Sequence, residues 1–314
     1  MTNTATHTSP TLHTVVCPEL PKLGANSQPL PPASHRMAYW QWGDAHAPHV
    51  VVCVHGLSRQ GRDFDVLAQA IVERQPGVRV VCPDVVGRGQ SDWLSDPMGY
   101  QVPNYAMDMV TLLHHLQPQT LDWVGTSMGG LIGTVVAAQV GDTALMPLPV
   151  PVRKLVINDV GPVIQFEAIA RIGTYVGMPA RFDSLEQGAQ ALWMISQSFG
   201  PHSPEQWLAL SQHMLKPDGD AWVLHYDPAI AVPFRAVTAE AAAAGEAMLW
   251  QLYDQIQAQT LLLRGAQSDL LSSDTAQAMT QRGPRAQLRE FAGVGHAPTL
   301  IAPDQVQAVL NFLF

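Results

Sequence analysis

Charged residues are scarce in this chain of 314 residues, and several kinds of segment are missing from it. Asp, Glu, Lys and Arg make up 14% of the sequence, the net charge is −9, and Lys and Arg form no cluster. Because binding to nucleic acid requires clustered cations opposite the phosphates, we expect no nucleic-acid partner. No stretch approaches the roughly 20 apolar residues that a membrane-spanning helix needs, so we expect no membrane span either.

Cysteine is rare, and the usual metal-binding patterns are absent. The three cysteines are Cys17, Cys53 and Cys82, and the last two lie inside apolar runs where buried free cysteine is common. Residues 1–10 lack the basic and apolar regions of a signal peptide. Together these features favour a reduced, cytoplasmic setting. The chain contains no His-Glu-x-x-His or paired-Cys motif, so we expect no metal site.

The chain does contain an alternation of short apolar runs and helical patterns. The β-branched runs at 49–54 and 78–82 are typical of strands buried on both faces of a parallel sheet. Such an alternation predicts an α/β fold with a mostly parallel, doubly wound sheet. Further strands are expected at 14–17, 36–42, 121–124, 154–157, 260–263 and 287–291, and helices at 64–72, 105–116 and 303–314.

Two segments depart from this alternation. Residues 1–35 are rich in Pro, Ser and Thr, and we expect an N-terminal arm with little core of its own. Residues 162–250 contain helical patterns rich in Met, Trp, Gln and Ala and no convincing buried strand. We expect them to form a helical cap on the ligand side of a core built from residues 36–161 and 251–314. The alternative is that these helices form only a packing layer.

A serine flanked by glycines follows one of the predicted strands. Residues 125–129 read Gly-Thr-Ser-Met-Gly, and an apolar run with helical potential continues to residue 139. This strand-turn-helix context is that of a nucleophile elbow, where glycines avoid collisions as the chain folds back on itself. Ser127 is therefore the candidate nucleophile. Taken alone, the pattern is also compatible with an ordinary glycine-rich loop.

A serine hydroxyl needs a base to take its proton and a third group to hold that base. His296 lies on a glycine-rich loop after the last predicted strand and is the candidate base. Asp269 follows the preceding strand and is the candidate acid, which gives the chain order Ser, Asp, His. Asp159 follows the strand at 154–157 and is the rival for the acid, although we expect it to shape the turn into the cap.

Two backbone N–H groups are candidates for an oxyanion hole. Met128 directly follows the candidate nucleophile, and Leu57 follows His55 and Gly56 at the end of an earlier strand. Both donors belong to the main chain and would stabilise negative charge on a substrate oxygen whatever their side chains are. His55 is expected to brace its loop by hydrogen bonding.

Five motifs, taken in order, resemble those of an α/β-hydrolase fold enzyme of the esterase and lipase type. The resemblance covers roughly residues 36–314. It implies Ser127 as nucleophile, His296 as base and Asp269 as acid, with the oxyanion bound by the amides of Leu57 and Met128. The motifs are His55-Gly56, Asp84 to Ser91, Gly125 to Gly130, Gly265 to Asp269 and Gly295-His296, and Asp84 is expected to hydrogen-bond backbone amides.

The resemblance implies a serine hydrolase that cleaves a small-molecule carboxylic ester through an acyl-enzyme and requires no cofactor. Haloalkane dehalogenases and epoxide hydrolases of this fold carry Asp at the elbow, whereas this chain carries Ser127. The alternatives are a lactonase, a carbon-carbon bond hydrolase, and a ligand-binding protein without catalysis. Carbon-carbon bond hydrolases need a cation near a substrate carboxylate, for which Arg171 and Arg181 are candidates, although both residues are also compatible with an ordinary surface role.

Overall fold

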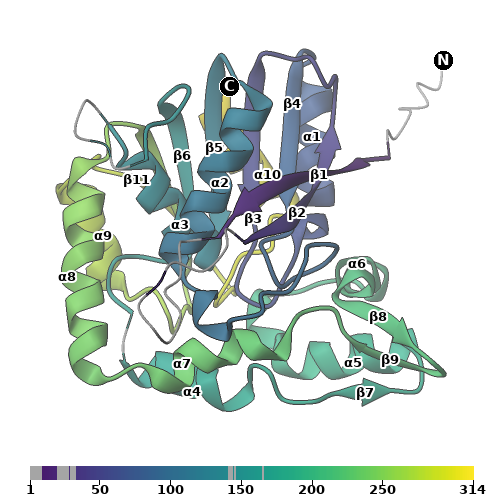
Figure 1. Cartoon of the computed structure of the whole chain (residues 1–314). Helices are drawn as coiled ribbons and strands as arrows, with labels where there is room; N and C mark the ends of the chain where they lie inside the picture. The colour runs from purple at the N-terminus through teal and green to yellow at the C-terminus, as the bar shows by residue number, and fades with distance from the viewer. Residues whose placement is uncertain (1–8, 20–27, 29–32, 141–143, 145, 165) are drawn as a thin grey trace, which may run out of the picture.

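A central sheet runs through the protein in the order β1-β2-β4-β3-β5-β6-β10-β11 (Figure 1). The computed structural model describes residues 9–19, 28, 33–140, 144, 146–164 and 166–314. The strands from β4 to β11 are parallel, and β1 and β2 are antiparallel. The predicted α/β class with a mostly parallel sheet is therefore confirmed. The strands are Thr11–Pro18 (β1), Ser34–Trp42 (β2), His49–Val54 (β3), Val78–Pro83 (β4), Thr120–Thr126 (β5), Val152–Asn158 (β6), Gln259–Gly265 (β10) and Gln287–Phe291 (β11).

Helices cover both faces of this sheet, because its middle strands bury side chains on both sides. One face packs against α1 and α10, and the other packs against α2, α3, α8 and α9. In the part of the chain that is described, no helix has both the length and the apolar character needed to cross a bilayer. The helices are Asp65–Arg74 (α1), Val102–Leu116 (α2), Met128–Ala137 (α3), Ala239–Gln255 (α8), Ser273–Gln281 (α9) and Pro303–Leu313 (α10).

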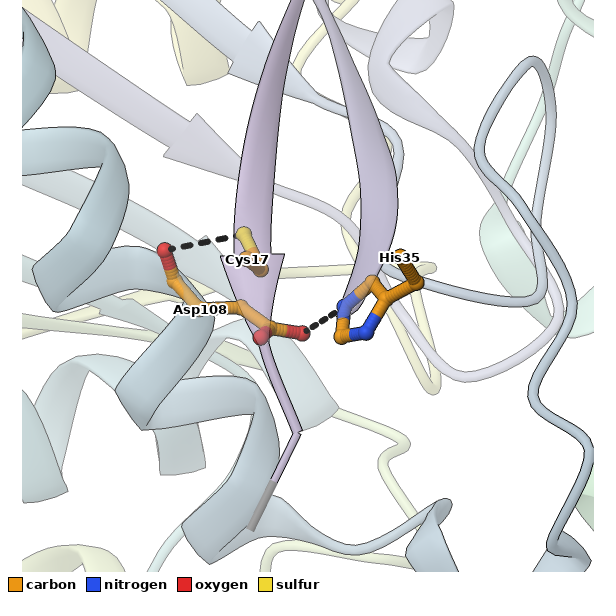
Figure 2. A group of neighbouring side chains, drawn as sticks. All are labelled: Cys17, His35 and Asp108. Carbon is orange, nitrogen blue, oxygen red and sulfur yellow. Dashed lines mark hydrogen bonds and ion pairs between the residues drawn. The ribbon is translucent and has the colours of Figure 1, made fainter. Parts of the chain in front are cut away.

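The described part of the N-terminal arm belongs to the sheet, which differs from the expectation of an arm with little core. β1 pairs with β2 along its whole length, and its alternating pattern buries Val15 and Cys17. Figure 2 shows the hydrogen bonds through which Asp108 of α2 holds both strands. His35 Nε2 lies 3.0 Å from Asp108 Oδ2, and the Cys17 thiol donates to the backbone carbonyl of Asp108. The remainder of the arm, at 1–8, 20–27 and 29–32, lies outside the described residues.

The segment between β6 and β10 lies at the carboxyl ends of the parallel strands and returns along α8 (Figure 1). It contains a small antiparallel sheet in the order β7-β9-β8, which the sequence did not predict because these strands are only two to four residues long. Two of its helices, α5 and α6, pack with the small sheet around a hydrophobic cluster that includes Trp207. The expected cap boundary at residue 250 falls inside α8, which packs against α3. The elements are Phe166–Tyr175 (α4), Arg181–Phe182 (β7), Leu185–Ile195 (α5), Pro204–Ser211 (α6), Leu215–Asp218 (β8), Ala221–Leu224 (β9) and Val232–Ala236 (α7).

The start of α3 packs directly on the ends of β3 and β5. A Cβ atom at Gly129 would lie 1.9 Å from the carbonyl oxygen of Val54, and one at Gly125 would lie 2.2 Å from the carbonyl oxygen of Gly129. Ser127, between the two glycines, has φ 52° and ψ −118°, a conformation that L-residues rarely adopt. The predicted strand-elbow-helix geometry is therefore present, and neither glycine has room for a side chain.

Gly129→Ala is expected to destabilise the protein by about 3 kcal/mol or more, because the added methyl group would collide with backbone that cannot rotate away. The matched control is Gly245→Ala in α8, where a Cβ would meet no atom within 4 Å. That change should be neutral or stabilising by up to about 1 kcal/mol, since alanine favours helix more than glycine does. Thermal unfolding of both variants tests the prediction, and equal melting temperatures would contradict it.

Candidate active site

Ser127 and His296 meet at the carboxyl edge of the sheet. Ser127 Oγ lies 2.9 Å from His296 Nε2, within hydrogen-bond distance. The elbow raises the serine from the end of β5, and the histidine reaches it from the loop between β11 and α10. Asn158 links the end of β5 to the loop that carries His296, since its Nδ2 donates to Thr126 Oγ1 and to the carbonyl of Pro298. The structure thus brings together the two residues that the sequence predicted as nucleophile and base.

The carboxylate that pairs with His296 belongs to Asp159 and not to Asp269, which corrects the expectation from the sequence. His296 Nδ1 lies 2.8 Å from Asp159 Oδ2, and the Asp159 side chain is fully buried. Asp269 is largely exposed and forms an ion pair with Arg171. The difference arises because Asp159 directly follows β6 and turns at once with a φ of 58°, whereas Asp269 lies four residues beyond the end of β10.

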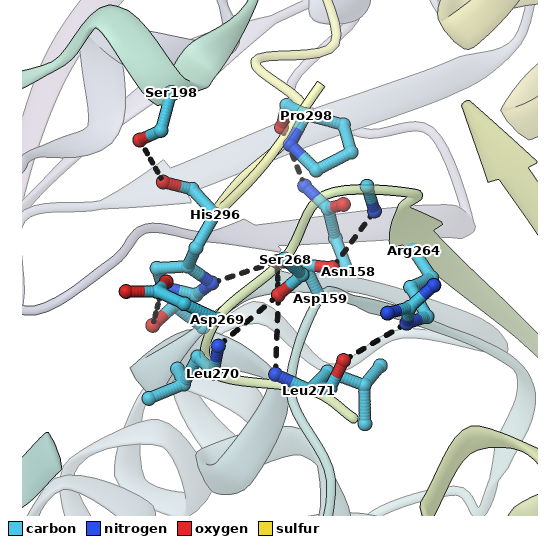
Figure 3. A network of polar contacts seen from close by, with 12 residues as sticks. Asn158, Asp159, Ser198, Arg264, Ser268, Asp269, Leu270, Leu271, His296 and Pro298 are labelled. Carbon is cyan, nitrogen blue, oxygen red and sulfur yellow. Dashed lines mark hydrogen bonds and ion pairs between the residues drawn. The ribbon is translucent and has the colours of Figure 1, made fainter. Parts of the chain in front are cut away.

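The loop after β10 supports the Asp159 carboxylate through hydrogen bonds (Figure 3). Asp159 Oδ1 accepts a hydrogen bond from the Gly265 N–H at 2.8 Å, and Oδ2 accepts one from Ser268 Oγ at 2.7 Å. Such donors favour the ionised carboxylate and fix its orientation. Ser268 Oγ is in turn held by two backbone N–H groups, those of Leu270 and Leu271.

The two expected oxyanion donors belong to the first residue of α3 and to the loop after β3. Met128 is the first residue of α3, so its N–H has no acceptor within the helix. Leu57 lines the same pocket as Ser127. Buried Arg88 braces both residues, because its Nε donates to the Leu57 carbonyl at 2.8 Å and its Nη2 lies 3.7 Å from Met128 Sδ. Sequence reasoning missed Arg88, although its place between two glycines in the Asp84 to Ser91 motif was a usable signal.

His55 and Asp84 have the bracing roles expected from the sequence. His55 Nε2 accepts a hydrogen bond from the Val85 N–H, which leaves Nδ1 protonated and donating to the Gly56 carbonyl. Burial lowers the pKa of His55 to about 3, so the ring is neutral and its two hydrogen bonds hold the loop in place. The Asp84 carboxylate accepts hydrogen bonds from two backbone N–H groups, those of Gly61 and Gln90.

A pocket of about 520 Å³ opens at Ser127 and His296, with walls from α4, α5, α6 and the core loops. This size is within the range of small-molecule sites. Two ion pairs line it, Arg59 with Asp63 and Arg171 with Asp269. Arg181, the other cap arginine noted in the sequence, is not among the lining residues and pairs with Asp218. Most of the remaining wall is apolar and includes Leu57, Ile172, Val176, Leu192, Phe199 and Leu210.

Among the residues that are described, Cys17, His35 and Asp108 are the group whose side chains offer closely spaced metal-binding atoms. These atoms lie within 4.8 Å of one another, and all three residues are buried. No sequence motif indicates this group, because its members are far apart along the chain. None of them lines the pocket at Ser127. A metal ion held there would therefore lie outside that pocket.

Comparison with known proteins identifies the family. The alpha/beta hydrolase family matches residues 51–309. This chain belongs to that family. The hydrolase is 50% identical over 296 residues to a 3-hydroxybutyrate-oligomer hydrolase from Cupriavidus necator, a match that covers 93% of this chain and 97% of that protein. The resemblance recognised in the sequence is thus confirmed, and the chain is a hydrolase.

Solved structures agree with this assignment. An alpha/beta hydrolase from Novosphingobium aromaticivorans is 30% identical to this hydrolase, with a TM-score of 0.76 and coverage of 96% of this chain and 98% of that one. An esterase from Mycobacterium tuberculosis shares the fold at 20% identity, with a TM-score of 0.69 and coverage of 98% of this chain and 91% of that one.

The geometry predicts different effects for the two aspartates of this hydrolase. Asp159→Asn should lower kcat toward p-nitrophenyl acetate by about 10⁴-fold, since the histidine would lose the carboxylate that holds and stabilises it. Asp269→Asn should cost less than about tenfold, because exposed ion pairs contribute little. Melting temperatures of both variants control for misfolding. A larger loss for Asp269→Asn would return the acid role to Asp269.

Proposed function

We propose that this hydrolase is a serine esterase that cleaves short oligomers of 3-hydroxybutyrate through an acyl-enzyme. The observation that carries the proposal is the chain of hydrogen bonds from Asp159 through His296 to Ser127 at the wall of a pocket. The substrate class rests on the relative that is 50% identical over nearly its whole length. A protein that only binds a ligand would not require this arrangement.

In the proposed acylation step, Ser127 Oγ attacks the carbonyl carbon of the ester while His296 Nε2 accepts the hydroxyl proton. The carbonyl oxygen becomes an oxyanion that the N–H groups of Leu57 and Met128 would stabilise. His296 then protonates the alkoxide as the carbon-oxygen bond breaks, so the alcohol half leaves and the acyl half stays on Ser127. Asp159 holds Nδ1–H and stabilises the imidazolium during both transfers.

Deacylation repeats the same steps with water. His296 takes a proton from a water molecule that attacks the acyl-enzyme, and the second oxyanion uses the same two amides. Collapse of this intermediate breaks the bond to Ser127 Oγ, which recovers its proton from His296. The products are a carboxylic acid and an alcohol, and the enzyme returns to its starting state.

The pocket wall suits a substrate of this kind. Each unit of a 3-hydroxybutyrate oligomer carries one methyl group and one ester, so most of its surface is apolar. Apolar surface enters an apolar pocket favourably, while a few polar groups set the orientation. The side chains of Ile172, Leu192 and Phe199 line the space next to the serine and are of this apolar kind.

Wild type is expected to release 3-hydroxybutyrate from its trimer, and Ser127→Ala should be at least about 10⁴-fold slower because it lacks the nucleophile. The assay is chromatography of the products, with p-nitrophenyl acetate, butyrate and octanoate as a parallel test of plain ester cleavage. Activity on the p-nitrophenyl esters without trimer cleavage would overturn the substrate class and leave the esterase chemistry. Full activity of Ser127→Ala would overturn the mechanism.

A further inference from the structure

The two arginines that line the pocket differ in how their donors are used. Arg59 forms a bidentate ion pair with Asp63, in which Nε donates to Oδ2 at 2.6 Å and Nη2 donates to Oδ1 at 2.7 Å. Its Nη2 also reaches the Leu210 carbonyl at 3.4 Å, and both members of the pair are mostly buried. Arg59 is therefore already neutralised and fixed by the protein itself.

Arg171 retains unused donors at the pocket wall. Its Nη2 donates to Asp269 Oδ2 at 2.7 Å, and within the described chain Nε and Nη1 make no hydrogen bond. The two side chains are 57% and 59% exposed, so their ion pair contributes little to stability. Ile172 and Tyr175, which belong to the same helix, also line the pocket. Arg171 is thus a cation at the wall of the pocket that contains Ser127, and it can exchange its partner at little cost.

We propose that Arg171 forms a subsite for the free carboxylate of the substrate, and that Asp269 occupies this subsite when no substrate is bound. The inference rests on the proposed function. A 3-hydroxybutyrate oligomer carries a single charged group, the carboxylate at one end, and its interior units are chemically alike. The Arg171 guanidinium at the pocket wall therefore allows the enzyme to recognise that end, because its planar set of N–H donors can form two parallel hydrogen bonds with a carboxylate.

The chemistry of the oligomer also fixes which half of the substrate lies against α4. In every ester bond of such an oligomer, the free carboxylate is on the alcohol side and the free hydroxyl is on the acyl side. Arg171 therefore holds the leaving-group half, and the acyl half lies against the wall that includes Leu192, Phe199 and Leu210. The fragment that carries the carboxylate leaves first, and the fragment with the hydroxyl end stays on Ser127 until water releases it.

The overall charge makes such a local cation useful. The chain has a net charge of −9, which opposes the approach of an anionic substrate. Exchange of Asp269 for the substrate carboxylate leaves Arg171 paired, and the released Asp269 side chain is already largely exposed to water. The exchange therefore buries no unpaired charge, which is the costly event at such sites.

The test is competition against p-nitrophenyl butyrate by the 3-hydroxybutyrate trimer as free acid and as methyl ester, under initial-rate conditions. The methyl ester lacks the negative charge and gains one methyl group, so the ratio of the two inhibition constants reports carboxylate recognition as long as initial rates are taken before the methyl ester is itself hydrolysed. In wild type the acid should bind about tenfold more tightly than the methyl ester, as expected for a charge-assisted contact. In Arg171→Gln this ratio should fall to about one.

Two further variants complete the design. Arg181→Gln removes a cap arginine that is equally exposed but paired with Asp218 outside the pocket, and it should keep the wild-type ratio. Asp269→Asn removes the competing carboxylate, so the acid should bind several-fold more tightly than to wild type. Equal binding of acid and methyl ester by wild type, an unchanged ratio in Arg171→Gln, or weaker acid binding in Asp269→Asn would each overturn the subsite.

The failure of this inference is distinct from failure of the proposed function. Competition gives the KM of a trimer that is cleaved and the dissociation constant of one that is not, so an inhibition constant is obtained in either case, provided that p-nitrophenyl butyrate is hydrolysed. Absence of trimer cleavage together with a charge-dependent inhibition constant would keep the carboxylate subsite and overturn the oligomer as substrate. Trimer cleavage with equal inhibition constants for acid and methyl ester would keep the oligomer as substrate and overturn the carboxylate subsite.

Discussion

The backbone contact between α3 and the ends of β3 and β5 is the constraint on which the site geometry depends. Because Gly129 lies against the carbonyl of Val54, the chain between strand and helix has no room to relax. Ser127 is therefore held at a positive φ with its hydroxyl raised toward the histidine loop. The same turn places the first N–H groups of α3, and the positive end of its dipole, beside the serine.

The second constraint is the burial of a carboxylate beneath the histidine. A buried charge is tolerated when several donors surround it. Asp159 receives them from the ring of His296 and from the Ser268 hydroxyl and Gly265 N–H, which belong to two segments of the chain, the loop before α10 and the loop after β10. The ends of β6, β10 and β11 must therefore keep their register for the acid to remain in place. This ties the site to the sheet and explains why the loop after β10 belongs to the site through the donors of Gly265 and Ser268.

Much of the core fold and part of the site could be predicted from the sequence. The central strands are β-branched runs, and the spacing of two glycines around Ser127 indicates the elbow directly. The acid could not be assigned in this way, because Asp159 and Asp269 both follow strands that turn out to be neighbours. Asp159 reaches the histidine because its own φ is positive and because the Ser268 hydroxyl holds its carboxylate. A pattern of residue types shows neither the φ nor the hydrogen bond.

Other features depend on contacts between distant parts of the chain. The bracing of both oxyanion loops by Arg88 joins three segments, so no local pattern reports it. The short strands of the small sheet in the 162–250 segment have too few residues to show an alternation. The position of β1 at the edge of the main sheet likewise depends on α2, which covers its buried side.

The contacts of Ser198 with the histidine loop couple the position of the cap to the base. Ser198 Oγ donates to the His296 carbonyl, and its own carbonyl accepts from the Gly295 N–H at 2.6 Å. The cap is held to the core at other points as well, through the exposed pair of Arg171 and Asp269 and through buried contacts such as that of Tyr100 with Asp227. Because Ser198 holds the residues that carry the base, a shift of its loop relative to the core would also displace the imidazole, and the enzyme would lose activity as soon as this part of the cap moved.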